Sequence, residues 1–311
     1  MTRFTRITIA AATFRRPSGL SRLLDHIEAL ETAAVVTVLI CDNDGQEQAG
    51  KKIVEARLAK GYRFKLECIS EPKQGLSYAR NALFEHIATK ENCDYIAMID
   101  DDEWPSRQWL TKLEETAFQT KADVVGGPVQ SVFENETPPC VVHCEQFRRK
   151  RNQTGPVPVV LSTENALLKF SILGTIPKPW FDPVFATTGG EDADFFYRAK
   201  RSGATFAWAD DAEILEAIPA SRSTAQWALK RNFRRGSTTA WRATQRPEKL
   251  KSITRLVLFG LVGICSFPAF WFLGCRSPVR RLDARLRLWR SIGYFSGFAR
   301  YRVHEYKVDG V

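Results

Sequence analysis

Three consecutive aspartates, Asp100, Asp101 and Asp102, are the residues of this 311-residue sequence with the clearest chemical potential. They follow the apolar run at residues 95–99, which indicates a strand. Alternate side chains of an extended chain point the same way, so Asp100 and Asp102 would face one ligand. A divalent cation removes the repulsion between such carboxylates and also suits a diphosphate. The triplet predicts a metal site, with a solvated acidic turn or a helix cap as the alternative.

A second carboxylate pair, Glu191 and Asp192, follows Gly189 and Gly190 and opens a helical pattern at residues 193–201. The glycines permit a tight turn close to a ligand. A carboxylate at a helix start is stabilised by the helix dipole and stays ionised near neutral pH. An ionised aspartate can act as a general base toward an alcohol, so the pair predicts a catalytic site. Simple capping of the helix is the alternative.

A basic cluster follows Trp227 on a predicted helix and consists of Lys230, Arg231, Arg234 and Arg235. Residues four apart share a helix face, so the cluster presents two pairs of cations. Such clusters bind phosphate groups. A solvated or membrane-facing surface is the alternative interpretation.

The elements that would position these residues alternate along the first half of the chain. Strand patterns at residues 7–12, 35–41, 64–69, 95–99 and 123–125 are separated by helical patterns at 20–30, 53–60, 76–88 and 109–118. This order predicts an α/β fold with a doubly wound, mostly parallel sheet. Four polar clusters, at residues 13–16, 42–44, 71–74 and 100–103, follow the first four strands. Ligands bind at that edge of such sheets.

The second half of the chain is less regular. Residues 130–183 are rich in proline and contain one strand pattern, at 165–170, so we expect an irregular region that covers a substrate. A helix at 193–201 and a strand at 205–209 follow. The seven cysteines are scattered, and residues 2–6 lead directly into a strand pattern, so we expect reduced thiols and no secretory signal. Cys140, His143 and Cys144 lack a nearby fourth ligand for a metal clip.

The net charge of +10 is concentrated near the C-terminus. From Arg222 onward the acidic residues are only Glu248, Asp283, Glu305 and Asp309. This distribution favours a basic C-terminal module over a nucleic-acid-binding protein, so no nucleic acid is expected among the partners.

Residues 256–275 are uncharged and about long enough to span a bilayer, but both flanks are basic. A single crossing would export the second basic cluster, against the positive-inside preference. We therefore predict a re-entrant hairpin or an in-plane anchor on the cytoplasmic face of a bacterial inner membrane. Residues 280–289 fit an interfacial helix. A single crossing and a hairpin buried in the core are the alternatives.

Five segments, in this order, resemble the inverting family 2 glycosyltransferases with the GT-A fold. They are residues 8–24 (TIAAATFRRPSGLSRLL), 40–45 (ICDNDG), 74–81 (QGLSYARN), 98–103 (MIDDDE) and 190–203, which contains Glu191, Asp192, Arg198 and Gly203. The similarity covers residues 5–240, with Gln46 where the family has a serine. Within this family, the motif sequences are most similar to those of bacterial exopolysaccharide enzymes of the succinoglycan-biosynthesis type.

The resemblance implies a domain at residues 1–240, with a Rossmann-like nucleotide-sugar half at 1–128 and an acceptor half at 129–240. Residues 241–311 would then form a helical, membrane-associating region. The implied reaction transfers a hexose, with inversion, from a nucleotide-diphosphate sugar to a saccharide acceptor in cell-surface polysaccharide biosynthesis. UDP is the expected nucleotide, and the acceptor is expected to be lipid-linked.

The resemblance also implies roles for individual residues. Asp102 would be the main ligand of Mn²⁺ or Mg²⁺, with Asp100 as its helper, and Asp192 beside Glu191 would deprotonate the acceptor. Asp42 would contact the base, and an arginine at 231–235 would stabilise the departing diphosphate. The implied nucleotide-sugar-binding set is Thr13, Arg15, Asp42, Lys73, Gly75, Arg80, Asn81, Asp100, Asp101, Arg231, Arg234 and Arg235.

Two other functions use comparable parts. A sugar nucleotidyltransferase also needs an α/β sheet and acidic metal ligands, but it usually opens with a glycine-rich G-x-G-T-R loop. Here the first strand leads to Thr13-Phe-Arg-Arg-Pro17. A noncatalytic membrane-associated scaffold would tolerate loss of Asp102 or Asp192, and both are present.

Overall fold

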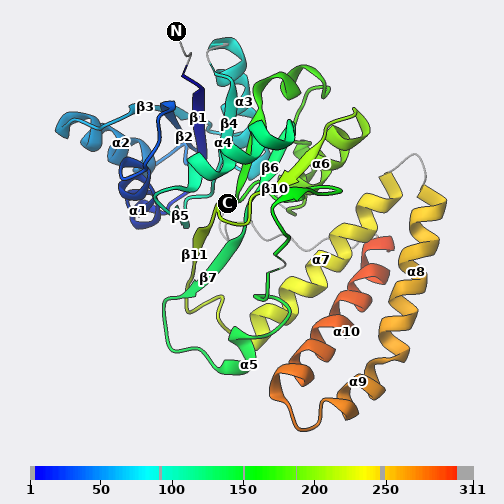
Figure 1. Ribbon diagram of the computed structural model, residues 1–311. Helices are drawn as coiled ribbons and strands as arrows, with labels where there is room; N and C mark the ends of the chain where they lie inside the picture. The colour runs from blue at the N-terminus through cyan, green and yellow to red at the C-terminus, as the bar shows by residue number, and fades with distance from the viewer. Residues whose placement is uncertain (1–3, 91–92, 150, 187, 246–248, 300–311) are drawn as a thin grey trace. The chain divides into compact units, whose positions relative to one another are not determined.

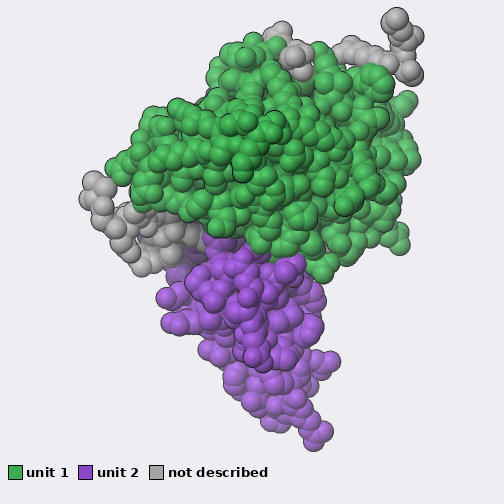
Figure 2. Space-filling model, turned by 90° about the vertical axis from the view of Figure 1, so that its left-hand side faces the viewer, with its two compact units in different colours: residues 1–130, 150–216 green, residues 131–149, 217–311 purple. Residues whose placement is uncertain are grey.

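The computed structural model describes residues 4–90, 93–149, 151–186, 188–245 and 249–299 (Figure 1). The chain forms two compact units, shown in different colours in Figure 2. Unit 1 contains residues 1–130 and 150–216, and unit 2 contains residues 131–149 and 217–311. The expected boundary at residue 240 falls inside a helix of unit 2, so the compact units do not follow it. The functional division at that residue stays a prediction.

Unit 1 begins with the predicted alternation of strands and helices. Its first half contains β1 (Arg6–Thr13), α1 (Pro17–Glu28), β2 (Val35–Asp42), α2 (Ala49–Lys60), β3 (Lys65–Ser70), α3 (Leu76–Lys90), β4 (Tyr95–Met98), β5 (Glu103–Pro105), α4 (Trp109–Thr120) and β6 (Val124–Gly126). Its second half contains β8 (Gly155–Pro156), β9 (Ala166–Lys169), two 3₁₀ turns (Phe170–Gly174 and Pro183–Phe185), α6 (Glu191–Arg201), β10 (Phe206–Trp208) and most of β11 (Ile214–Ile218).

The large sheet of unit 1 has the strand order β3-β2-β1-β4-β9-β6-β10-β8. The first four strands are parallel, as expected for this α/β fold. Strand β9 lies antiparallel between β4 and β6, and β8 is antiparallel to β10. The strand pattern at 165–170 was therefore found, but its insertion into the middle of the sheet was not. In register, Thr13 lies opposite Asp42, and Asp42 opposite Ser70, so three strand ends meet at one edge.

Helices cover both faces of this sheet. One core cluster combines Leu20 and Leu24 of α1 with Trp109 of α4. The other combines Phe84 of α3 with Phe195 of α6. Because side chains alternate along a strand, β4 contributes to both clusters, with Ala97 on one side and neighbouring residues on the other. This packing fixes the strand ends that carry the polar residues.

Unit 2 is mainly helical. Its elements are α5 (Pro139–Val142), α7 (Ala225–Gln245), α8 (Lys249–Cys265), α9 (Phe267–Leu273) and α10 (Pro278–Phe298), and β7 (Val129–Phe133) runs into it from unit 1. Helices α7, α10 and α8 lie side by side, in yellow, red and orange (Figure 1). The helix predicted after Trp227 is confirmed as α7. The expectation of one strand pattern in residues 130–183 was wrong, since β7, α5 and β8 also form there.

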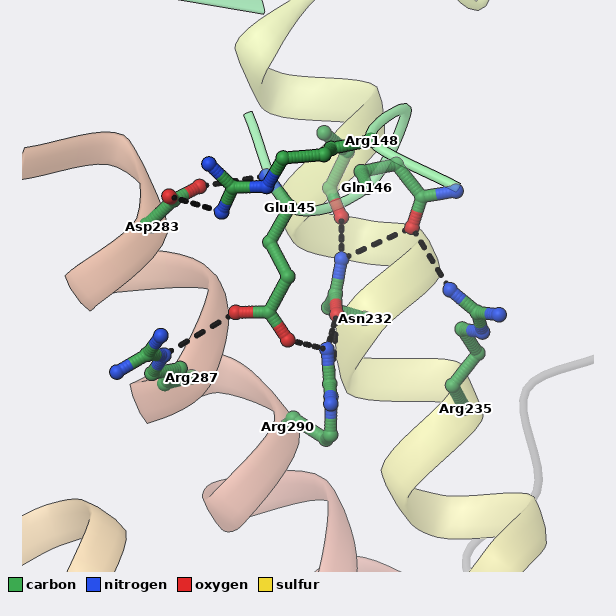
Figure 3. Close-up of polar contacts among 9 residues, drawn as sticks. Glu145, Gln146, Arg148, Asn232, Arg235, Asp283, Arg287 and Arg290 are labelled. Atoms are coloured by element: carbon green, nitrogen blue, oxygen red, sulfur yellow. Dashed lines mark hydrogen bonds and ion pairs between the residues drawn. The ribbon is translucent and has the colours of Figure 1, made fainter. Parts of the chain in front are cut away.

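The loop after α5 ties α7 to α10 through a polar network (Figure 3). Glu145 accepts hydrogen bonds from Arg287 at 3.1 Å and from Arg290 at 2.9 Å. Arg290 also donates to Asn232 of α7, whose amide in turn donates to Gln146 at 3.0 Å. Burial raises the pKa of the Glu145 carboxyl, but the two arginines outweigh it and leave the pKa below its ordinary value.

Candidate active site

The aspartate triplet lies just after β4, at the sheet edge where it was expected. Asp101 is buried, and its carboxylate accepts hydrogen bonds from Thr13 Oγ1 and from Arg16, both at 2.8 Å. Burial raises the pKa of Asp101 to about 6, although Arg16 opposes that shift. The same Arg16 nitrogen donates to Asp102 Oδ2 at 2.7 Å. Arg16 belongs to the polar cluster predicted after the first strand, but it was not among the predicted site residues.

An acidic cluster forms around the first member of the triplet. Asp100, Glu103 and Glu164 each offer a carboxylate oxygen, and these atoms lie within 4.8 Å of one another. The backbone N–H of Asp100 donates to Glu103 at 2.8 Å. Glu103 is buried, and burial, together with the charges of Asp100 and Glu164, raises its pKa well above the ordinary value. A bound cation would relieve this repulsion.

The donor set of this cluster fits Mn²⁺ or Mg²⁺, because both are hard cations that prefer oxygen ligands. The predicted pair of ligands was Asp100 and Asp102. In the structure Asp100 belongs to the cluster with Glu103 and Glu164, whereas Asp102 is paired with Arg16. Glu164 was missed because it reaches Asp100 only through the insertion of β9 beside β4.

One buried guanidinium connects the acidic cluster to the second carboxylate pair. Arg80 on α3 is 4% exposed and donates to Asp100 at 3.1 Å and to Glu191 at 2.6 Å. Burial disfavours its charge, but Asp100, Glu191 and Asp192 outweigh that cost and raise the pKa of Arg80. Arg80 donates to two carboxylates of the chain, and its predicted contact with the nucleotide stays a prediction.

The second carboxylate pair occupies the start of α6, as predicted. Gly190 precedes the helix with a φ of 100°, a conformation that favours glycine. Glu191 is buried, and burial raises its pKa to about 7 against the effect of Arg80. Asp192 is half-buried, and its carboxylate accepts the N–H of Ala193 at 2.6 Å. Asp192 is therefore the more accessible member of the pair.

The predicted base-reading residue, Asp42, is buried at the end of β2. Its two carboxylate oxygens accept the backbone N–H groups of Asp44 at 3.0 Å and Lys51 at 2.9 Å. These bonds fix the turn into α2, and contact with a nucleotide base stays a prediction. Arg15 pairs with Asp44 at 3.0 Å beside this turn.

The segment predicted to line the nucleotide pocket lies at the start of α3. Gly75 donates its N–H to Asn43 Oδ1 at 2.8 Å, and Lys73 places its ammonium 4.1 Å from the centre of the Tyr78 ring. Asn81 exchanges two hydrogen bonds with the backbone of Phe181, at 2.6 and 3.0 Å. Asn81 therefore anchors the chain that leads to α6.

The predicted phosphate-binding arginines Arg231, Arg234 and Arg235 lie on α7 in unit 2. Arg231 stacks its guanidinium 5.0 Å from the centre of the Trp227 ring, and Arg235 donates to Gln146 at 3.2 Å. Their contact with a diphosphate stays a prediction.

Within unit 1, Arg80 thus connects the acidic cluster around Asp100 to the carboxylate pair at the start of α6. Residues 8–176, more than half of the chain, match the model of Glycosyl transferase family 2. The chain belongs to glycosyl transferase family 2. The matched residues run from β1 through the aspartate triplet to the 3₁₀ turn after β9. This membership makes the protein a glycosyltransferase, as the sequence motifs indicated.

A relative of this glycosyltransferase is the Succinoglycan biosynthesis protein ExoM of Rhizobium meliloti (strain 1021), which is 30% identical over 301 residues. The match covers 94% of this chain and 92% of the relative. The resemblance to succinoglycan-biosynthesis enzymes is thereby confirmed.

Solved structures share the GT-A fold of this glycosyltransferase. A mannosyltransferase from Pyrobaculum calidifontis, in complex with GDP-Man and Mn²⁺, has a TM-score of 0.60 at 15% identity and covers 96% of this chain and 88% of its own. S. aureus TarS in complex with UDP has a TM-score of 0.52 at 12% identity, with coverage of 98% and 94%. At these identities the likeness concerns the fold alone.

Proposed function

We propose that this glycosyltransferase transfers a hexose, with inversion, from a UDP-sugar to a lipid-linked saccharide in cell-surface polysaccharide biosynthesis. The observation that carries the proposal is the bridge made by Arg80. It links Asp100 of the cation-binding cluster to Glu191 beside the base candidate Asp192. Arg80 thereby links the carboxylates proposed to bind the donor's cation to the carboxylate pair proposed to act on the acceptor. The relative's role in succinoglycan biosynthesis and the UDP complex of TarS support the acceptor and donor classes.

Asp192 is the proposed general base that activates the acceptor. Its ionised carboxylate takes the proton of an acceptor hydroxyl, whose oxygen attacks the anomeric carbon of the donor sugar. The bond from that carbon to the diphosphate oxygen breaks, and the electron pair leaves with the nucleoside diphosphate. Attack from the opposite side inverts the configuration at the anomeric carbon.

The donor half depends on the acidic edge of the sheet. Asp100, Glu103 and Glu164, with Asp102 beside them, would hold Mn²⁺ or Mg²⁺. When bound, the cation neutralises the diphosphate and stabilises its departure. Thr13 and Arg16 keep Asp101 in place, so the triplet is oriented before the donor arrives. On the sequence resemblance alone, Arg231, Arg234 and Arg235 are proposed to add positive charge at the departing diphosphate.

A screen of the full chain with UDP- and GDP-sugars tests the proposal. Each donor is offered with Mn²⁺ or with EDTA, and with a saccharide linked to a lipid diphosphate as acceptor. The expected result is release of UDP that requires Mn²⁺, with a product whose new linkage is inverted relative to the donor. Retention of configuration would contradict the assigned base, and formation of a nucleotide sugar from a sugar phosphate would favour a nucleotidyltransferase.

A further inference from the structure

Helices α8 and α9 present large apolar side chains outward. Val262 is 63% exposed, Phe272 is 76% exposed and Leu273 is 72% exposed, and Leu258 and Phe259 are exposed beside them. We refer to these five residues as the apolar face. In a helix at the surface of a water-soluble protein, the large apolar residues point inward. Large apolar side chains exposed on two successive helices indicate a partner that is itself apolar.

The side of α8 that packs within unit 2 carries glycines instead. A Cβ atom at Gly260 would lie 2.7 Å from the ring of Phe295 on α10, and one at Gly263 would collide with Ser291 Oγ. The helices therefore approach closely through small residues, as helices in membranes do. The large residues of α8 are left for an outside surface. This arrangement also rules out the alternative that residues 256–275 form a hairpin buried in the core.

Arginines lie beside aromatic residues of both helices, one of them within the apolar face and two next to it in sequence. The guanidinium of Arg255 lies 5.2 Å from the centre of the Phe259 ring, that of Arg287 lies 5.3 Å from Phe270, and that of Arg281 lies 5.4 Å from Trp271. Between residues 249 and 298 the sequence has a single acidic residue, Asp283, which is buried and paired with Arg148. An apolar face with arginines beside it matches a bilayer with anionic headgroups.

We propose that α8 and α9 form a docking surface for one leaflet of an anionic lipid bilayer, with the apolar face inserted below the headgroups. Among the described helices no single one is long and apolar enough to cross a membrane, whereas α8 and α9 pass that test together across a 45° bend. Crossing is disfavoured because Arg281 and Arg287 of α10 lie against α9. A crossing pair would draw these charges into the hydrocarbon region, where charge is costly.

A second copy of the chain is a poorer occupant than lipid. A two-fold contact through the apolar face would bring the same arginines close to one another. Anionic headgroups neutralise these arginines instead. The docking surface does not depend on the proposed reaction, although it would bring the enzyme to lipid-linked acceptors.

Co-sedimentation of the full chain with lipid vesicles tests the docking. Vesicles of phosphatidylcholine alone are compared with vesicles that contain phosphatidylglycerol, without any donor sugar. We expect binding to the anionic vesicles that weakens as salt rises. Val262→Glu and Leu273→Glu should each lower the affinity by about tenfold or more, because a charge replaces inserted apolar surface. The matched control Leu58→Glu, at a 49% exposed position of α2 in unit 1, should bind normally.

Depth of insertion is measured with a fluorophore on Cys265, which is exposed near the middle of the α8–α9 pair, after Cys275→Ser removes the other exposed thiol. Lipids with a nitroxide near the headgroup should quench the label more than lipids with a nitroxide at the acyl terminus. The opposite order would overturn one-leaflet docking in favour of a crossing. Vesicle binding equal in Val262→Glu and Leu58→Glu would overturn the docking surface. A third outcome would also overturn it: the wild-type chain fails to bind vesicles and forms a dimer, and Val262→Glu dissociates that dimer.

Discussion

The two units of this glycosyltransferase depart from the usual distribution of side chains in opposite ways. Unit 1 buries ionisable groups, among them Arg80, Asp101, Glu103 and Glu191. Unit 2 exposes large apolar groups on α8 and α9. Both arrangements cost free energy in an isolated soluble domain. In unit 1 the compensation is internal, through a network of ion pairs and hydrogen bonds, whereas in unit 2 we infer that it comes from lipid.

Removal of the buried guanidinium of Arg80 in unit 1 should have the largest effect on stability. Arg80→Met leaves Asp100 and Glu191 buried without their shared partner, so the free energy of unfolding should fall by about 3–5 kcal/mol. Urea denaturation of the full chain measures this change. Arg107→Met is the matched control, because Arg107 is 74% exposed and its pair with Glu31 is worth at most about 1 kcal/mol. Equal losses in the two variants would contradict internal compensation.

The next largest effect is expected on donor binding, when a carboxylate of the aspartate triplet is removed. Asp102→Ala should lower the affinity for a UDP-sugar in Mn²⁺ by roughly 100-fold, or about 2.7 kcal/mol, because the cation loses a ligand. Calorimetric titration provides the measurement, and EDTA should produce a similar loss in wild type. The exposed Asp211→Ala serves as control.

The companion variant Glu164→Ala sharpens this test of the acidic edge. If it weakens donor binding while Asp102→Ala does not, the cation is held by Asp100, Glu103 and Glu164 alone. Unchanged affinity in both variants would remove the cation site from this edge.

In unit 2 a loss of charge should cost less, because the network of Figure 3 is partly exposed. Glu145→Gln removes the carboxylate charge that pairs with Arg287 and Arg290, and should lower the free energy of unfolding of α7 and α10 by about 1–2 kcal/mol. Hydrogen exchange resolved by segment measures this change, with the exposed Glu136→Gln as control. Protection lost from α3 and β4 instead would contradict the local role of the network.

The comparison also predicts an effect on pH dependence. Burial raises the pKa of Glu191 from an ordinary value of 4.5 to about 7, so folded Glu191 holds its proton more tightly than the unfolded chain does. This contribution to stability is complete below pH 4.5 and is lost as the pH rises through about 7. Glu191→Gln should therefore flatten the decline in stability over that window, as urea midpoints at several pH values would report. The exposed Glu115→Gln should leave the slope as in wild type.

Local patterns were sufficient to predict the first four strands of unit 1, because each is a short apolar run followed by polar residues. They also placed Asp100 and Asp192 at the strand end and helix start where the structure has them. The patterns could not show that β9 enters the sheet antiparallel beside β4, since strand pairing is a long-range property. That pairing brings Glu164 to Asp100. The hydrogen bonds from Arg16 to Asp101 and Asp102 also depend on a long-range property, because they require the ends of β1 and β4 to lie side by side.

Turnover and donor binding of Asp192→Asn, measured side by side on the full chain, test the central claim most directly. The amide cannot accept the proton of the acceptor, so turnover should fall by about 10²–10⁴-fold. The affinity for the UDP-sugar in Mn²⁺ should stay at the wild-type value, because the acidic cluster around Asp100 is unchanged. Turnover close to that of wild type, with binding intact, would contradict the assignment of the base to Asp192.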